Sequence, residues 1–75
     1  MLAQLGQEIQ LRRESLGYTQ QDIAEYLGVS DTTIRNIEKG KPGVAIGHWY
    51  KITELLGLSI TITPKKMNHE TGNSI

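Results

Sequence analysis

The chain has 75 residues without a cysteine, and its eight basic residues balance its eight acidic ones. These totals exclude disulfides, thiolate metal sites and a strongly basic overall charge, and no apolar run reaches the roughly 18–20 residues of a membrane span. Because a domain of this size buries only about 60% of its unfolded surface, we expect it to gain stability by oligomerising, and we expect a cytoplasmic protein without a cofactor.

The first residues predict a helix with one apolar face. The stripe recurs every three or four residues and consists of Leu2, Leu5, Ile9, Arg13 and Leu16. Arg13 is the exception, because an unpaired charge on a buried face would be costly. Arg13 therefore needs a partner, and Gly17 is placed to end the helix.

A capping box predicts the start of a second helix. Thr19 and Asp22 have the spacing in which each side chain bonds the backbone N–H of the other, so the helix begins at Gln20. Gly28 is placed to stop it. The inner face of this helix is predicted to consist of Ile23, Ala24 and Leu27.

The third helix is predicted to begin after Ser30, a good N-cap residue. Asp31 follows in the first turn, where a negative charge suits the helix dipole. Ile34 and Ile37 are spaced to point inward, and Gly40 ends the helix. Ala24 in the second helix lets the two helices approach closely, and Gly28 permits the tight turn between them.

A fourth helix is predicted from Val44 or Ala45 to Gly57. Its apolar residues cover more than one face, namely Ile46, Trp49, Tyr50, Ile52, Thr53, Leu55 and Leu56. Two apolar faces indicate that the helix packs on its own domain and also on something else.

Residues 58–63 change the period from helical to two, which predicts a strand. Leu58, Ile60 and Ile62 alternate with polar residues, and Pro64 ends the run. The chain offers no second strand, so the backbone of this one needs a ladder partner, most simply the same strand of a second copy. We therefore predict one domain over 1–63 that forms a homodimer through 58–63, followed by a flexible polar tail over 64–75.

The ordered spacing of the second and third helices resembles that of a known family. Residues 13–40, RESLGYTQQDIAEYLGVSDTTIRNIEKG, are similar to the helix-turn-helix of the Cro/C1 (XRE-type) regulators. The resemblance implies the lambda-repressor-like fold, mainly α, with four to five short helices. It also implies that the exposed face of the third helix enters the major groove of double-stranded DNA.

The end of the chain narrows the resemblance. The fourth helix followed by GLSITIT resembles antitoxins of the HipB type, whose C-terminal strand pairs across a dimer. In such toxin–antitoxin systems the antitoxin represses its own operon and binds a HipA-like kinase toxin. These partners are implied by the resemblance alone.

The resemblance also assigns roles by position. Base-edge contacts fall to Asp31, Thr32, Thr33, Arg35 and Asn36, and phosphate contacts to Gln20, Ser30, Lys39 and Lys41. Dimerisation falls to Trp49, Leu58, Ile60 and Ile62, and a partly buried structural ion pair to Arg13 and Glu38. We assign that pair to structure, not to DNA recognition. Arg12 departs from the pattern, since the family usually has an apolar residue there.

Three functions remain open at this point. The first is a sequence-specific repressor that binds an inverted-repeat operator as a homodimer and acts as the antitoxin of a HipBA-type operon. The second is a stand-alone XRE-type regulator. The third is a protein-interaction module, because the zero net charge and the acidic Asp22, Glu25 and Asp31 oppose phosphate. An enzyme is not expected, since no nucleophile–base pair or phosphate-cradling glycine loop is visible.

Overall fold

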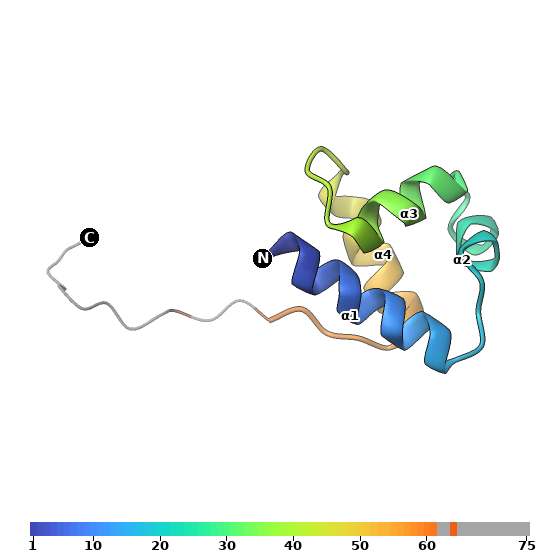
Figure 1. Cartoon of the computed structure of the whole chain (residues 1–75), viewed down its shortest axis with the longest axis horizontal. Coiled ribbons are helices and arrows are strands. Elements are labelled where there is room, and N and C mark those ends of the chain that lie inside the picture. The colour runs from blue at the N-terminus through green and yellow to red at the C-terminus, as the bar shows by residue number, and fades with distance from the viewer. Residues whose placement is uncertain (62–63, 65–75) are drawn as a thin grey trace, which may run out of the picture.

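The computed structural model describes residues 1–61 and residue 64. Within these residues the chain forms four helices joined by short loops (Figure 1): α1 (Leu2–Ser15), α2 (Gln20–Leu27), α3 (Asp31–Lys39) and α4 (Ile46–Leu56). The prediction of a mainly α fold is therefore confirmed for this part of the chain. None of these helices is long and apolar enough to cross a membrane.

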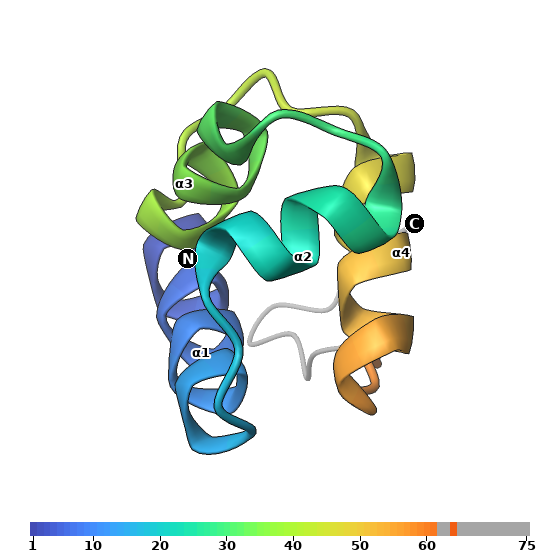
Figure 2. The same ribbon diagram turned by 90° about the vertical axis from the view of Figure 1, so that its right-hand side faces the viewer.

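The four helices enclose one core. The helix α3 packs against α1 and α2, and α4 packs against the same two helices. Figure 2 shows α1 and α4 on opposite sides of the molecule, with α2 crossing between them. The side chains that are fully buried at the centre are Ile23, Ile34, Ile37, Ile52 and Leu56.

The predicted stripe of α1 is buried only in its middle. Ile9 is 3% exposed and Arg13 is 7% exposed, whereas Leu2 and Leu16 are 38% and 44% exposed. Leu2 and Leu16 lie at the two ends of the helix, where no neighbouring element covers them as fully. The predicted apolar stripe is therefore buried at its centre and exposed at its two ends.

The sequence signals at the helix ends are matched by hydrogen bonds. The Thr19 hydroxyl accepts from the backbone N–H of Asp22 at 3.0 Å, and the Asp22 carboxylate accepts from that of Thr19 at 2.8 Å. Gly28 (φ 70°) ends α2 in the left-handed conformation, which lets the chain turn sharply into α3. The steep angle between α2 and α3 follows from this turn.

The start of α4 and the predicted strand differ from expectation. Ala45 is the N-cap, so α4 begins at Ile46, one or two residues later than predicted. Of the predicted strand, residues 58–61 follow α4 without regular secondary structure, and 62–63 lie outside the described residues. Apart from Pro64, the predicted tail lies outside them too. The strand and its pairing stay predictions.

Arg12, which departs from the family pattern, has a specific structural role. Its Nε donates to the backbone carbonyl oxygen of Leu56 at 2.8 Å. Leu56 is the last residue of α4, so its carbonyl oxygen accepts no hydrogen bond within the helix. The guanidinium thus satisfies the end of α4 and ties it to α1.

We expect Arg12→Ala to lower the free energy of unfolding by about 1–2 kcal/mol, because it removes a charge-assisted hydrogen bond from a helix end. Urea denaturation followed by circular dichroism measures the change. Gln10→Ala on the same helix is the control, since Gln10 makes only a 3.3 Å bond to the exposed Glu14, and it should stay within about 0.5 kcal/mol of wild type. An Arg12→Ala protein as stable as this control would contradict the role.

Candidate nucleic-acid interface

The helix α3 carries its polar side chains on the face opposite to its two central isoleucines. Ile34 and Ile37 are 0% exposed and hold α3 against the core. By helical spacing, the opposite face consists of Thr32, Arg35, Asn36 and Lys39. Asn36 is half-buried and the other three are exposed. We call these four residues the outer face of α3, and it presents hydrogen-bond donors, an acceptor and a methyl group to solvent.

Three further predicted DNA-contacting residues lie at the start of α3, beside the outer face. The Ser30 hydroxyl accepts from the backbone N–H of Thr33 at 3.2 Å and lies 3.1 Å from the Thr33 hydroxyl. The Ser30 hydroxyl therefore serves first as the N-cap of α3, with the Thr33 hydroxyl beside it. Asp31 is exposed next to them, in the first turn of the helix.

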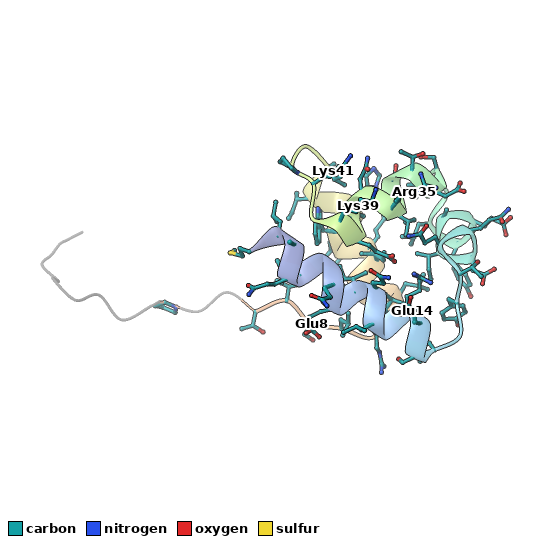
Figure 3. All side chains as sticks on the ribbon, in the orientation of Figure 1. Glu8, Glu14, Arg35, Lys39 and Lys41 are labelled. Atoms are coloured by element: carbon teal, nitrogen blue, oxygen red, sulfur yellow. The ribbon has the colours of Figure 1, made fainter. Side chains whose placement is uncertain are left out.

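Three basic side chains lie along one edge of the domain, although the charges of the chain sum to zero. Figure 3 shows Arg35, Lys39 and Lys41 along α3 and the loop after it, whereas Glu8 and Glu14 lie along α1 on the other side of the view. The loop is held in place because the backbone N–H of Lys41 donates to the carbonyl of Asn36 at 3.0 Å. The neutral total thus conceals a basic edge at α3, which weakens the argument against a phosphate-bearing partner.

Gln20 stands at the first position of α2 and is half-buried. Its side-chain Nε2 donates to Glu38 Oε1 at 2.9 Å. The start of a helix also points backbone N–H groups outward, an arrangement that suits anions. The side chain of Gln20, which the sequence predicts to contact a phosphate, is therefore held in place by its hydrogen bond to Glu38.

The Arg13 guanidinium and the Glu38 carboxylate form a two-pronged ion pair. Arg13 Nε donates to Glu38 Oε2 at 2.6 Å and Nη2 donates to Oε1 at 3.1 Å, and the two side chains are 8% and 3% exposed. Arg13 Nη1 also donates to the carbonyl of Tyr18 at 2.7 Å. The hydrogen bond to Glu38 is the main reason why the pKa of Arg13 is raised above its ordinary value, so Arg13 remains charged within the core.

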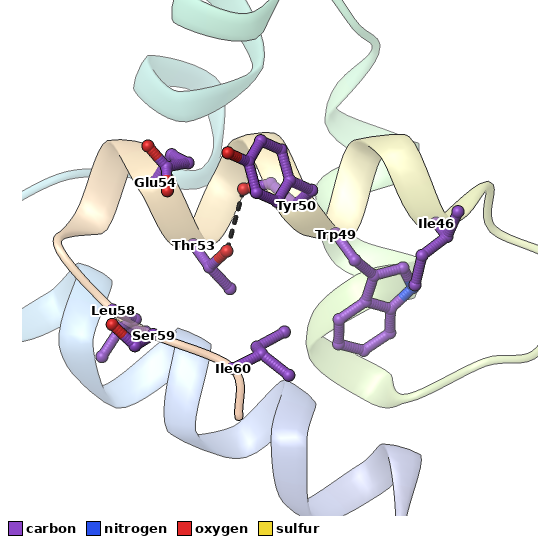
Figure 4. Close-up of a pocket in the computed structure, with 8 residues that line it drawn as sticks. All are labelled: Ile46, Trp49, Tyr50, Thr53, Glu54, Leu58, Ser59 and Ile60. Carbon is purple, nitrogen blue, oxygen red and sulfur yellow. Dashed lines mark hydrogen bonds between the residues drawn. The ribbon is translucent and has the colours of Figure 1, made fainter. Parts of the chain in front are cut away.

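The residues predicted to contact a second copy lie on α4 and in the segment that follows it. Trp49 is 5% exposed and belongs to the core, Leu58 packs against that core, and Ile60 is 47% exposed. Ile62 lies outside the described residues. Figure 4 shows the surface cavity beside Trp49, about 310 Å³ in volume, which is lined by Ile46, Trp49, Tyr50, Thr53, Glu54, Leu58, Ser59 and Ile60. Ile46 (81%) and Tyr50 (63%) add exposed apolar surface around it.

Sequence reasoning missed one residue that sets the position of α3. A Cβ atom at Gly6 would lie 2.5 Å from the carbonyl oxygen of Glu38 and would also meet that of Ile37. The backbones of α1 and α3 therefore meet at Gly6, and only glycine fits between them. The available signal was a glycine inside an otherwise regular helical pattern, which often marks a close approach of two backbones.

Comparisons with known proteins agree with this geometry. A model of the helix-turn-helix family (HTH_3) matches residues 9–62. Antitoxin HipB of Escherichia coli strain K12 is 32% identical over 63 residues, which cover 84% of this chain and 72% of the relative. Antitoxin HipB of Escherichia coli O6:H1 is also 32% identical over 63 residues, which cover 67% of that relative.

Solved structures share the same arrangement of helices. One is described as the structure of a HipA-HipB-O2-O3 complex, and its matching chain has a TM-score of 0.76 at 30% identity, over 88% of this chain and 93% of that one. Another, a HipB-O4 20mer complex, has a TM-score of 0.74 at 31% identity, over 85% of this chain and 90% of that one.

These matches span most of the chain at a level of identity that defines a family. The family model covers α2, α3 and α4 completely, together with the second half of α1. The chain therefore belongs to the helix-turn-helix family of DNA-binding domains of the Cro/C1 (XRE) type, and it is not an enzyme.

Proposed function

We propose that the protein is a sequence-specific transcriptional repressor that reads an inverted-repeat operator through the outer face of α3. The observation that carries this proposal is the outer face itself. It is polar and projects from a helix that Ile34 and Ile37 fix on the opposite side. The major groove of B-DNA is wide enough to admit such a helix.

The side chains of α3 supply the chemistry that base edges require. Arg35 can donate two hydrogen bonds to guanine, and Asn36 can bond the N6 and N7 atoms of adenine. The Thr32 methyl group suits a thymine methyl, with Thr33 beside it. Asp31, at the start of the helix, can accept from cytosine N4.

Phosphate contacts would hold the helix in the groove. Lys39 and Lys41 are exposed at the end of α3, and Gln20 and Ser30 stand at the starts of α2 and α3. Contacts of this kind fix the register of a protein on DNA without reading its sequence. Their contribution to affinity depends on salt when the contacting residue is charged.

Reversing the charges of Lys39 and Lys41 distinguishes a protein that binds DNA from one that binds only a protein partner. We expect Lys39→Glu combined with Lys41→Glu to weaken binding to a duplex and to reduce the slope of log K against log salt by about 0.9 for each phosphate that the variant no longer neutralises. Glu8→Lys is the control, because Glu8 lies on α1 away from this edge (Figure 3), and it should not weaken binding. Equal binding by the Lys39/Lys41 variant would instead favour a protein partner at this face.

We further propose that two copies act together as a cytoplasmic homodimer. A two-fold pair would place two α3 helices in successive major grooves, roughly 34 Å apart. Leu58, Ile60 and Ile62 would pair with their copies in the partner, and Trp49 and the exposed apolar surface beside it would be covered. The domain would then extend over 1–63, with 64–75 as a tail.

Truncation after Gly57 tests the dimer. We expect the shortened protein to sediment as a monomer at concentrations at which the full chain is a dimer, and to bind its operator more weakly. A truncated protein that dimerises as well as the full chain would show that the strand is not the dimer contact.

The similarity to HipB supports a more specific role. We propose that the protein is the antitoxin and autorepressor of a HipBA-type operon, with a HipA-like kinase as its protein partner; HipA and HipB occur together in one of the similar structures. A kinase-like reading frame next to this gene is the expected observation. Its absence would leave a stand-alone XRE-type regulator as the function.

A further inference from the structure

The Glu38 carboxylate joins three helices and not only two. Its Oε2 accepts from Arg13 Nε at 2.6 Å, and its Oε1 accepts both from Arg13 Nη2 at 3.1 Å and from Gln20 Nε2 at 2.9 Å. The Glu38 side chain is 3% exposed, whereas Gln20 is half-buried at the start of α2. The amide of Gln20 is thus anchored on its inner side by a buried group and reaches solvent on its outer side.

We propose that Glu38 is a positioning residue for DNA binding, which acts by fixing the side-chain amide of Gln20 for contact with a phosphate. This inference rests on the function proposed above. The Gln20 Nε2 atom carries two hydrogens. One is donated to Glu38, and the second can be donated to a phosphate at the start of α2. The Arg13–Glu38 pair therefore serves recognition as well as structure.

The backbone around Gln20 favours the same ligand. The first N–H groups of a helix have no acceptor within that helix. The Thr19 hydroxyl accepts a hydrogen bond from the N–H of Asp22. The N–H groups of Gln20 and Gln21, at the same end of α2, are available to a ligand. A phosphate bonded to these backbone groups would lie beside the Gln20 amide.

Because the Gln20 amide is already held in place, DNA binding costs less side-chain entropy. A glutamine side chain that is free in solution loses rotamer freedom when it contacts a ligand. The hydrogen bond to Glu38 has already restricted Gln20 before DNA arrives. A carboxylate near a phosphate would normally oppose binding, but two guanidinium nitrogens of Arg13 bond this carboxylate, so the pair presents no net charge.

The proposal predicts the opposite sign from simple electrostatics for Glu38→Gln. Loss of a negative charge near DNA should strengthen binding if charge alone matters. In this variant, however, the single amide oxygen at position 38 would accept from Arg13. The amide NH2 group at position 38 would then face the NH2 group of Gln20, and two donors cannot bond each other. The Gln20 amide would then turn away from its position, and binding should weaken.

A double-mutant cycle on a 20-base-pair duplex of random sequence at low salt tests the inference, with concentrations corrected for the folded fraction. We expect Gln20→Ala to weaken binding about tenfold and Glu38→Gln to weaken it about two- to tenfold. The double variant should bind as Gln20→Ala does, because Glu38 acts through Gln20. Glu8→Gln is the charge-matched control, because Glu8 is exposed on α1 away from this cluster, and it should not weaken binding.

A Glu38→Gln protein that binds the duplex as tightly as wild type, or more tightly, would overturn this inference alone. The inference would also be overturned if the loss of affinity in the double variant were the product of the losses in the two single variants. A wild-type protein that binds no duplex would overturn the proposed function and this inference together.

A second measurement needs no variant and covers the case in which Glu38→Gln does not fold. NMR relaxation of the Gln20 side-chain NH2 in the wild-type protein should give an order parameter near the value of about 0.85 for rigid backbone. The exposed Gln21 side chain is the internal control and should be mobile. A Gln20 amide below about 0.6 would overturn the inference.

Discussion

Glu38→Ala is expected to lower the free energy of unfolding by about 3–5 kcal/mol, because it leaves the Arg13 guanidinium buried without its counter-charge. Deprotonation cannot relieve this cost, because an arginine guanidinium stays protonated in proteins. Domains of this kind have a total stability of only about 5–15 kcal/mol, so the variant should be largely unfolded at moderate urea concentrations. Urea titration followed by the fluorescence of the buried Trp49 measures the loss.

Replacing both charges separates the effect of an unpaired charge from that of reduced packing. Arg13→Met combined with Glu38→Met removes the pair but leaves no buried ion, and such replacements are often close to neutral. We expect this double variant to recover most of the stability that Glu38→Ala removes, less the bonds to Tyr18 and Gln20. A double variant less stable than the single one would contradict this explanation.

Gly6→Ala should destabilise the protein by about 1–3 kcal/mol, although alanine is the better helix former. Helix propensity alone predicts a gain of about 1 kcal/mol for this change inside a helix. The new methyl group would instead collide with the carbonyl groups of Ile37 and Glu38. Because these are backbone atoms, α1 and α3 must separate to admit the methyl group.

Gly47→Ala is the matched control. Gly47 also lies in a helix, as the second residue of α4, and a Cβ there meets nothing within 4 Å. This variant should gain about 0.5–1 kcal/mol. Thermal unfolding of the two proteins should thus shift the midpoint in opposite directions, and a Gly6→Ala protein that is stabilised like Gly47→Ala would show that α1 and α3 are not in close contact.

The local elements of the fold could be predicted because their signals are local. The Thr19–Asp22 capping box and the turn at Gly28 each depend on residues a few positions apart. The burial of Ile34 and Ile37 followed from their spacing within one helix. The four helices could be placed from such signals, except that α4 begins slightly later than predicted.

Contacts between distant residues could not be predicted from local patterns. The approach of Gly6 to α3, the Arg12 bond to Leu56 and the Gln20 bond to Glu38 each depend on how complete helices pack. The net charge of zero likewise gave no sign of the edge formed by Arg35, Lys39 and Lys41 (Figure 3), and only the family resemblance pointed to these residues. The strand predicted over 58–63 would need a second copy of the chain as its partner, so one chain alone does not test its pairing.

The central claim, that the outer face of α3 reads DNA sequence, is tested most directly by titrating the protein and its Asn36→Ala variant against its own promoter and a random duplex of equal length. We predict that wild type binds the promoter at least about a thousandfold more tightly than the random duplex. Asn36→Ala should reduce this ratio by about 5- to 150-fold, as expected when one bidentate bond to a base is removed, while the affinity for the random duplex stays nearly unchanged. Equal wild-type affinity for both duplexes, or a ratio that Asn36→Ala does not alter, would contradict the claim.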